Sequence, residues 1–224
     1  MREVVLDTET TGIDPAEGHR VIEVAAIELV NLLPTGRHFH TLINPERDIP
    51  AESTRIHGFT QADVTQAPRF AEIAGGLLAF LADSPVVAHN APFDAAHLNA
   101  EFERLSLPPL PPERFVDTLA LAKTRFPGLP NSLDALCRRF GIDLSERTTH
   151  NALLDVRLLA QVYLELRGGR QPALGLSPAA VAAAQAEAPL ARTPRPIRVP
   201  PERAAAHREF LAKLKKPLWL AAEE

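Results

Sequence analysis

The sequence has little of what builds disulfides, thiolate metal sites or membrane spans. Its 224 residues include one cysteine, Cys137, which excludes an internal disulfide and a zinc site with several thiolate ligands. No apolar run approaches the ~20 residues that cross a bilayer. Near the N-terminus, Asp7 interrupts the chain before the apolar region of a signal peptide could develop. We therefore expect a soluble, cytoplasmic protein with no membrane partner.

Basic residues are scarce in most of the chain. Residues 1–169 carry 15 Lys and Arg against 23 Asp and Glu, a net charge of −8. Residues 170–224 carry nine against five, a net charge of +4. Because affinity for nucleic acid depends largely on cations that displace condensed counterions, the acidic part is a poor general nucleic-acid binder on its own. If the protein acts on nucleic acid, a partner must supply positive charge.

Hydrophobic periodicity predicts an α/β fold for residues 1–169. Short apolar or β-branched runs predict five strands, and apolar residues at helical spacing predict helices. This order of elements favours a mixed five-stranded sheet flanked by helices. The expected strands lie near residues 4–6, 21–30, 38–44, 85–89 and 115–118, with a turn at 33–36, and the expected helices cover about 70–81, 92–105, 133–140 and 151–167.

The composition changes after residue 169. Residues 170–200 are rich in alanine and proline, which is typical of a flexible linker. Residues 201–216 regain helical character, with proline at the start and lysines at the end. A helix of about fifteen residues is marginal in water, so we expect it to form on a partner. The predicted domains are therefore 1–169, 170–200 and a helical tail, 201–224.

Two acids end the first predicted strand. Asp7 and Glu9 are two residues apart, so their side chains point to the same side of the strand. Two like charges at ~4 Å repel by ~4 kcal/mol at an effective dielectric of 20, and a divalent cation would remove that repulsion. The acids could instead cap the turn that follows at Thr10 to Gly12. These residues alone leave both interpretations open.

Two further acids and a histidine stand near the starts of predicted helices. Asp94 follows the fourth strand, and Asp155 lies behind His150 at the start of the last helix. Each acid could simply be a first-turn residue favoured by the helix dipole, and His150 a loop histidine without a task. A separation of five residues places His150 and Asp155 about 140° apart on an ideal helix. If both serve one site, His150 must precede the helix or begin it.

The order and local context of these five residues resemble those of the catalytic residues in the DEDDh 3′-to-5′ exonucleases. The five are Asp7, Glu9, Asp94, His150 and Asp155. The chain resembles, more narrowly, the proofreading (epsilon) subunits of bacterial DNA polymerase III. Each motif is weak alone, but the ordered set is specific and spans residues 1 to about 169. The matching stretches are Asp7-Thr-Glu-Thr-Thr-Gly12, Ile56-His57-Gly58, His89-Asn-Ala-Pro-Phe-Asp94, Asn131-Ser-Leu-Asp-Ala-Leu-Cys137 and His150-x4-Asp155.

The resemblance implies a ribonuclease H-like fold and two-metal hydrolysis of the terminal phosphodiester. Hard carboxylate oxygens suit hard cations, so two Mg²⁺ or Mn²⁺ ions are expected, with Asp7 between them and Asp94 acting through bound water. His150 would take the proton of the attacking water, a task most often given to histidine. The predicted catalytic residues are His150 and Asp94, and the predicted metal ligands are Asp7, Glu9, Asp94 and Asp155.

The resemblance also implies a pocket for a single-stranded or frayed DNA 3′ end. Mispaired termini unstack more cheaply, so such a pocket would select them. Phe93 could instead belong to the core, and His57 could simply be buried. The residues expected to contact the terminal nucleotide or its ions are Asp7, Glu9, Thr10, Gly12, Glu52, His57, His89, Asn90, Phe93 and Asp155. The predicted activity is proofreading for the replicative DNA polymerase.

The C-terminal part resembles partner-binding segments of the same family. Gln171-Pro-Ala-Leu174-Gly-Leu176 is similar to a sliding-clamp peptide, with Gln171, Leu174 and Leu176 as anchors. Gly175 departs from the usual bulky ending, so we expect weaker clamp binding; a chance linker peptide is the alternative. The tail is similar to a segment that docks on the polymerase (alpha) subunit, and a basic solvated helix is its alternative. Its expected contact residues are Phe210, Leu211, Leu214 and Trp219.

Three other functions remain open at this point. A DEDDh exoribonuclease that trims RNA 3′ ends would use the same catalytic set, but the tail disfavours it. A non-catalytic clamp or polymerase adapter could keep the fold, although all five catalytic residue types are present. A repair nuclease acting alone would be expected to have a basic groove and no partner-binding tail.

Overall fold

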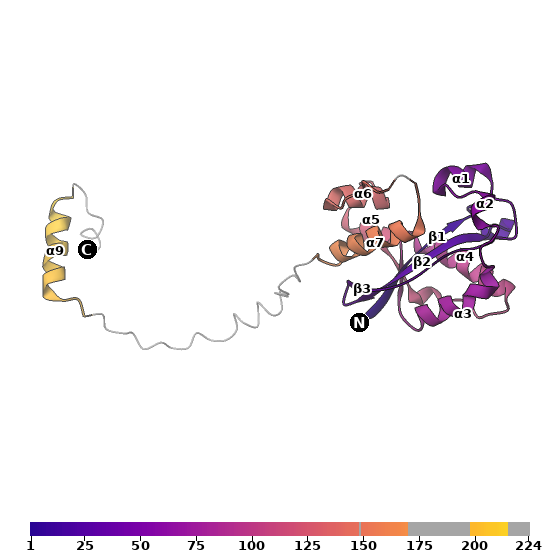
Figure 1. The fold of residues 1–224 in the computed structure, drawn as a ribbon. Helices are drawn as coiled ribbons and strands as arrows, with labels where there is room; N and C mark the ends of the chain where they lie inside the picture. The colour runs from indigo at the N-terminus through magenta and orange to yellow at the C-terminus, as the bar shows by residue number, and fades with distance from the viewer. Residues whose placement is uncertain (148, 170–197, 215–224) are drawn as a thin grey trace. The chain divides into compact units, whose positions relative to one another are not determined.

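A mixed sheet in the order β3-β2-β1-β4-β5 is the centre of the computed structural model, which describes residues 1–147, 149–169 and 198–214 (Figure 1). The central strand β1 pairs antiparallel with β2 and parallel with β4; β3 and β5 form the two edges. The prediction of a five-stranded mixed sheet is confirmed. The strands are β1 (Arg2–Thr10), β2 (Val21–Val30), β3 (Leu33–Leu42), β4 (Val86–Ala88) and β5 (Phe115–Asp117).

Helices cover both faces of this sheet. The four helices expected from apolar periodicity are present: two have the predicted limits, and the ends of the other two differ from them by one residue. Those four are α3 (Phe70–Leu81), α4 (Ala91–Arg104), α6 (Leu133–Phe140) and α7 (Ala152–Leu166). The sequence did not predict α1 (Ala51–His57), α2 (Gln61–Val64) and α5 (Thr118–Arg125), or the 3₁₀ turns η1 (Pro15–Glu17) and η2 (Pro112–Arg114).

The predicted turn at residues 33–36 is wrong. These residues are the start of β3, and the β2–β3 hairpin turns at Asn31 and Leu32, which have φ angles of 52° and 68°. Two consecutive positive φ angles are typical of the tight turn whose twist matches that of the flanking strands. Pro34 is tolerated in β3 because this strand lies at the sheet edge, where a missing N–H need not remove a ladder bond.

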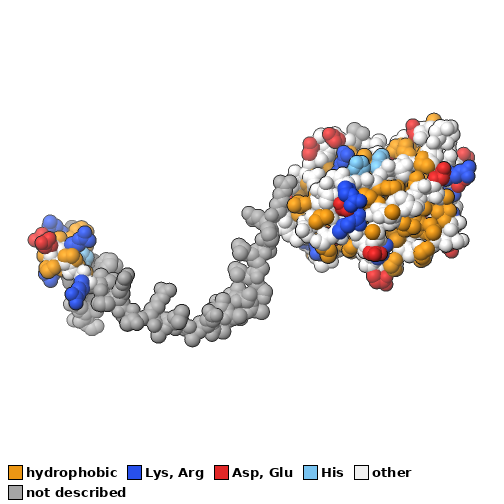
Figure 2. Space-filling view, turned by 60° about the horizontal axis from the view of Figure 1, so that its bottom comes forward, with side chains coloured by type: hydrophobic (Ala, Val, Ile, Leu, Met, Phe, Trp, Pro, Cys, Tyr) orange, Lys and Arg blue, Asp and Glu red, His pale blue; other side chains and the backbone are white. Residues whose placement is uncertain are grey.

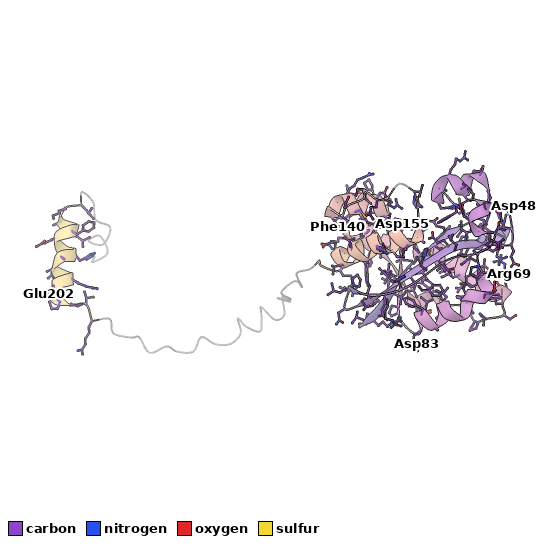
Figure 3. The ribbon with its side chains drawn as sticks, viewed as in Figure 1. Asp48, Arg69, Asp83, Phe140, Asp155 and Glu202 are labelled. Carbon is purple, nitrogen blue, oxygen red and sulfur yellow. The ribbon has the colours of Figure 1, made fainter. Side chains whose placement is uncertain are left out.

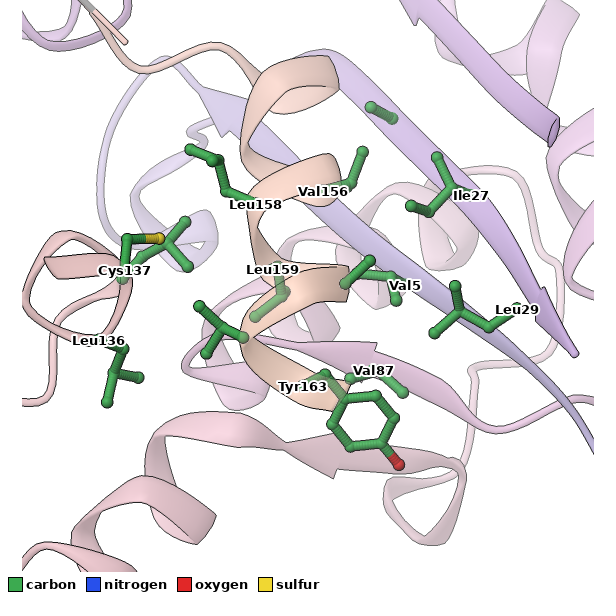
Figure 4. Close-up of a cluster of buried hydrophobic side chains, with 14 of the residues drawn as sticks. Val5, Ile27, Leu29, Val87, Leu136, Cys137, Val156, Leu158, Leu159 and Tyr163 are labelled. Carbon is green, nitrogen blue, oxygen red and sulfur yellow. The ribbon is translucent and has the colours of Figure 1, made fainter. Parts of the chain in front are cut away.

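The core consists of two apolar clusters, one on each face of the sheet. Side chains of β1 alternate between them: Val5 joins the cluster beneath α5, α6 and α7, while Val4 and Leu6 join the cluster beneath α3 and α4. Figure 4 shows the first cluster, in which Leu159 and Tyr163 of α7 lie over the sheet. The same alternation continues beyond the core and sends later β1 side chains to opposite faces.

Contacts divide the chain into two units, residues 1–174 and 175–224. In the second unit α9 (Pro201–Ala212) is the described helix, with Phe210 exposed and Leu211 buried; Leu214, two residues after its end, is also exposed. Trp219 and the predicted clamp peptide 171–176 lie outside the described residues. Within the described ranges, no helix is long and apolar enough to span a membrane.

Basic, acidic and apolar side chains are interspersed on the surface of the first unit that Figure 2 shows. On the face drawn in Figure 2, basic side chains stand singly or in small groups among acidic and apolar ones. This matches the net charge of −8 carried by residues 1–169. On this face, attraction for a nucleic-acid backbone therefore has to come from local groups rather than from a broad positive field.

Candidate active site

Four acids approach one another where β1 ends and where α4 and α7 begin. Asp7 and Glu9 follow Val5 at alternate positions, so they lie on the face of β1 that meets α7. One ligand atom each of Glu9, His150 and Asp155 lies within 4.8 Å of the others. Asp7 borders the same pocket as His150 and Asp155, and Figure 3 labels Asp155 on α7. This part of the site joins residues almost 150 positions apart in the sequence.

Asp94 reaches the cluster from the opposite face of the sheet. It lies in the first turn of α4, is buried, and accepts a hydrogen bond of 2.8 Å from the Thr8 hydroxyl. Thr8 lies between Asp7 and Glu9, and its side chain points to the α4 face of β1. The Asp94 carboxylate is close enough to raise the pKa of Asp7.

The electrostatics of the cluster favour added positive charge. Loss of water, followed by repulsion from Asp94 and Glu9, raises the pKa of Asp7 well above its usual range. Loss of water and repulsion from Glu23 raise the pKa of Glu9 to about 8, and burial raises the pKa of Asp94 to about 7. Carboxylates held together against their repulsion, offering only hard oxygen ligands, fit divalent cations such as Mg²⁺ or Mn²⁺.

His150 precedes α7, in the place that its spacing from Asp155 requires. Its backbone N–H donates to the carbonyl of Ile56 at 3.2 Å, and Asn151 caps the helix by accepting from the N–H of Leu154. The His150 Nδ1 atom lies 3.6 Å from Asp155 Oδ2, and about half of the side chain is exposed. The ring is therefore next to the acids and still open to solvent.

Sequence reasoning missed Arg147. Its Nε and Nη2 atoms each donate to one oxygen of Asp155 at 2.7 Å, and Nη1 donates to Asp134 of α6. Nη2 also lies 3.1 Å from His150 Nδ1. The side chain is nearly buried, and its charge lowers the pKa of Glu9. No local pattern pointed to it, because an arginine in a loop acquires this role only through the fold.

Sequence reasoning also missed Glu23, although it left a signal: a carboxylate within the apolar run of β2. Glu23 is fully buried and pairs in register with Glu9. It accepts hydrogen bonds from the N–H of Ala152 at 2.9 Å and from the Asn151 side chain at 3.3 Å. His40 Nε2 lies 2.7 Å from its carboxylate. Glu23 thereby fixes the start of α7, two residues after His150.

A second pocket of about 310 Å³ adjoins the acids. Its walls come from the end of β1 and the following turn, from α1, and from the start of α4. Asn90, by contrast, lines neither this pocket nor the one that holds Asp155; it is exposed, at φ 72°, before α4. Predicted residues on the pocket walls are Glu9, Thr10, Gly12, Glu52, His57 and Phe93, whereas Asp7 and His89 border the pocket of Asp155.

Two of the predicted substrate residues have a ring nitrogen without a partner. Among the described side chains, buried nitrogen or oxygen atoms that lack a hydrogen bond are His57 Nε2, His89 Nε2 and Arg114 Nε. The N–H of Phe59 donates to His57 Nδ1, so the neutral ring carries its proton on Nε2. Burial lowers the pKa of His57 and therefore favours this neutral form.

His89 leaves both of its neutral tautomers open. Its Nδ1 lies 2.9 Å from the hydroxyl of Thr118, which also lies 3.1 Å from the carbonyl of Ala88. The hydroxyl has one hydrogen, so it can donate either to Ala88 or to His89 Nδ1. Burial lowers the pKa of His89 as well. The site thus offers a free donor at His57 and, at His89, a ring nitrogen without a partner among the described residues.

A mixed five-stranded sheet with clustered acids at the end of its central strand is the arrangement of a ribonuclease H-like, metal-dependent 3′-to-5′ exonuclease. The exonuclease family model (RNase_T) matches residues 4–163. The structure of exonuclease X in complex with 5′ overhanging duplex DNA superposes with a TM-score of 0.58 at 25% identity. That match covers 73% of this chain and 90% of that one.

Two curated relatives from different species carry the same name. DNA polymerase III subunit epsilon of Rickettsia conorii (strain ATCC VR-613 / Malish 7) is 44% identical over 227 residues, 98% of this chain and 99% of the relative. The subunit of the same name from Rickettsia typhi (strain ATCC VR-144 / Wilmington) is 51% identical over 174 residues, 76% of each chain. The chain belongs to the exonuclease family and, within it, to the DNA polymerase III epsilon subunits.

Proposed function

We propose that this protein removes mispaired nucleotides from DNA 3′ ends while it is bound to a replicative polymerase. One observation carries the proposal: acids from β1 and α7 lie next to His150, Asp94 of α4 is close enough to raise the pKa of Asp7, and each of the two adjoining pockets has one histidine with an unpaired ring nitrogen. The acids would hold metal ions, and the second pocket would hold the terminal nucleotide.

Asp7, Glu9, Asp94 and Asp155 are the proposed ligands of two Mg²⁺ or Mn²⁺ ions. Such ions supply stabilisation of negative charge on the attacking and departing oxygens of a phosphodiester. The raised pKa values of Asp7, Glu9 and Asp94 support this assignment, because they measure how strongly the fold disfavours uncompensated charge there.

His150 is the proposed general base. Its exposed ring can approach a water molecule near the acids, while the backbone bond to Ile56 keeps the segment in place. Arg147 holds Asp155 and also donates to His150 Nδ1, the ring nitrogen that carries the free electron pair, so the ring would have to leave this contact before it accepts a proton from water. A positioned base of this type typically accelerates proton transfer by ~10² to 10⁴.

The second pocket is the proposed site of the terminal nucleotide. His57 Nε2–H can donate to a base carbonyl or a phosphate oxygen, and Phe93 offers an aromatic face for stacking. His89 presents its unpaired ring nitrogen next to Asp7. A nucleotide must leave its stack to enter, and a mispaired terminus does so at lower free-energy cost than a paired one.

A polymerase would supply the positive charge that the first unit lacks. The relatives are named as subunits of DNA polymerase III, which supports the polymerase (alpha) subunit as the partner of the tail. A sliding clamp is the proposed partner of peptide 171–176. Tethering raises local concentration, so weak intrinsic affinity for DNA would suffice.

The proposal is tested by metal-dependent release of mononucleotides from a labelled primer. A mispaired 3′ end should be trimmed faster than a matched one, and EDTA should stop both reactions. An RNA strand of the same sequence should be degraded more slowly than DNA. The matched control is Asp7→Asn, which should be inactive on every substrate. Equal rates on mispaired and matched ends would contradict proofreading, and activity in EDTA would contradict the metal site.

A further inference from the structure

In the turn that follows β1, the carbonyl groups of Thr11 and Gly12 accept hydrogen bonds from side chains of two different helices. The Ser53 hydroxyl of α1 donates to the carbonyl of Thr11 at 2.8 Å. The ring of His97 in α4 lies with Nε2 3.1 Å from the carbonyl of Gly12. Both side chains are buried, His97 almost completely. This turn, α1 and the start of α4 are the three walls of the second pocket.

We propose that Ser53 and His97 are positioning residues that set the spacing of the nucleotide pocket. His97 does not line the pocket; Ser53 does, but its hydroxyl hydrogen is donated to the carbonyl of Thr11. Each joins the turn to a helix that carries another wall, α1 with His57 and α4 with Phe93. The inference rests on the proposed function, because it assigns these residues to the binding of the terminal nucleotide.

His97 contacts two walls at once. Its ring centroid lies 4.4 Å from that of Phe93, and its Nδ1 lies 3.0 Å from the Phe93 carbonyl. A neutral imidazole carries one N–H, so it can donate to only one of the two carbonyls. Within α4 the Phe93 carbonyl already faces the backbone N–H of His97, one helical turn on. The Nε2–H bond to Gly12 is therefore the one that adds a new connection.

Among the described residues, the other link from the turn to α4 is indirect: Thr11 is hydrogen-bonded to the backbone of Arg20, whose guanidinium binds Glu101 of α4. Gly12 has no side chain, and a Cβ atom there would overlap the ring of His19. Ile13 is 84% exposed. The hydroxyl of Thr10 also donates to the Gly12 carbonyl, at 2.7 Å, but this bond stays within the turn. Ser53 and His97 provide the links that reach across the pocket.

The fold can tolerate loss of the His97 bonds, because α4 has a second connection to the same loop. Glu101, one turn further along α4, forms two bonds with Arg20 at 2.6 and 2.9 Å and accepts from the N–H of Val21. His97→Phe preserves ring packing against Phe93 while removing both nitrogens. The variant should therefore fold with a misplaced turn rather than unfold.

Three variants test the proposal in the full chain: Ser53→Ala, His97→Phe and His97→Gln. The first two should raise KM for a short single strand, and the dissociation constant of thymidine 5′-monophosphate measured by calorimetry with Mn²⁺, by roughly 3- to 10-fold each, the net effect of one hydrogen bond. The kcat should change less than KM, because neither residue lines the pocket that holds His150 and Asp155. His97→Gln keeps a donor and should stay closer to wild type.

Asn99→Ala is the matched control. Asn99 lies two residues beyond His97 on α4 and makes two hydrogen bonds to the backbone of Leu110, at 2.8 and 3.1 Å, away from the pocket. It should lower the melting temperature about as much as His97→Phe while leaving KM and nucleotide affinity unchanged. Ring ¹⁵N shifts of His97 should report protonation at Nε2.

The outcomes separate this inference from the proposed function. If His97→Phe and Ser53→Ala cleave the single strand with unchanged KM and bind the nucleotide with unchanged affinity, the positioning role is wrong while the exonuclease assignment stands. If Asn99→Ala raises KM as much as they do, the effect is a general loosening of α4 and the inference also fails. A wild-type chain that released no nucleotide would overturn both.

Discussion

Arg147 contacts both carboxylate oxygens of Asp155, each at 2.7 Å, and so neutralises one acid of the cluster from within the protein. Both side chains are nearly buried, so water does little to screen the pair. The guanidinium also reaches His150, the proposed base. Arg147 therefore couples the charge of the metal site to the position of the histidine that would act there.

Replacing Arg147 with glutamine should destabilise the protein in the absence of metal. Asp155 would remain as an uncompensated, nearly buried charge, an effect that typically costs about 3 to 5 kcal/mol of unfolding free energy. The loss should shrink when Mg²⁺ is added. Urea unfolding with and without Mg²⁺ measures both effects. Arg138→Gln is the control: Arg138 is largely exposed, 4.0 Å from Asp134, and an exposed pair contributes at most ~1 kcal/mol.

Replacing His150 with alanine should leave the fold and the Mg²⁺-dependent rise in melting temperature intact. The backbone bond from residue 150 to Ile56 does not depend on the side chain. Turnover should fall by ~10² to 10⁴ because the proposed base is lost. Single-turnover cleavage of a labelled strand measures this, with the exposed His38→Ala as control. Undiminished turnover would remove His150 from the mechanism.

Replacing Asp7 with asparagine should make the metal-free protein more stable at pH 8. The raised pKa of Asp7 shows that its charged form is disfavoured in the fold, and asparagine removes that charge. The same change should abolish the rise in melting temperature on adding Mg²⁺. Thermal unfolding with and without the ion tests both effects. A rise that persists would place the metal ions elsewhere.

The metal-free protein should lose stability as pH increases from about 6.5 to about 8, above the range in which the lowered pKa values of His57, His89 and His97 act in the opposite direction. Carboxyl groups with an ordinary pKa of ~4 titrate in the unfolded chain, whereas the pKa values in the fold are raised to about 8 for Glu9 and about 7 for Asp94. The folded state then binds more protons across this interval, so the stability that these carboxyl groups contribute is highest below it and decreases through it. Excess Mg²⁺ should flatten the melting-temperature profile. A metal-free profile that rises over the same interval would contradict the clustering.

Deleting residues 201–224 should spare cleavage of short single strands and abolish co-purification with the polymerase subunit. The acids, His150 and both pockets belong to the first unit, which does not include the tail. Pull-down of a co-expressed polymerase subunit measures the second effect. Retained co-purification would show that the body, rather than the tail, makes the contact.

The strands and the longer helices could be predicted because their apolar residues repeat with a clear period. Helices α1 and α5 could not, since each buries only two of its residues and has no apolar stripe. The turn was misplaced because Leu33 to Gly36 have turn composition, while Asn31 and Leu32 carry the positive φ angles. The pairing of Leu33 with Val30 and of Pro34 with Leu29 places the turn at Asn31 and Leu32.

The same limit applies to the site. Asp7, Glu9, Asp94, His150 and Asp155 stand in recognisable local motifs, so their types and spacing identified them. Arg147, Ser53 and His97 could not be found in this way. Their roles depend on which carbonyl or carboxylate the fold brings within about 3 Å of them, and no local sequence pattern encodes that.

Alternation along β1 has a consequence for how the enzyme can fail. Asp7 and Glu9 face α7, and Thr8 faces Asp94, only in the observed pairing of β1 with β2. A slip of one residue would exchange the two faces, turning the acids toward α3 and α4 and Thr8 toward α7. The nuclease activity of a preparation therefore also depends on the fraction of chains in which β1 pairs with β2 in the correct register.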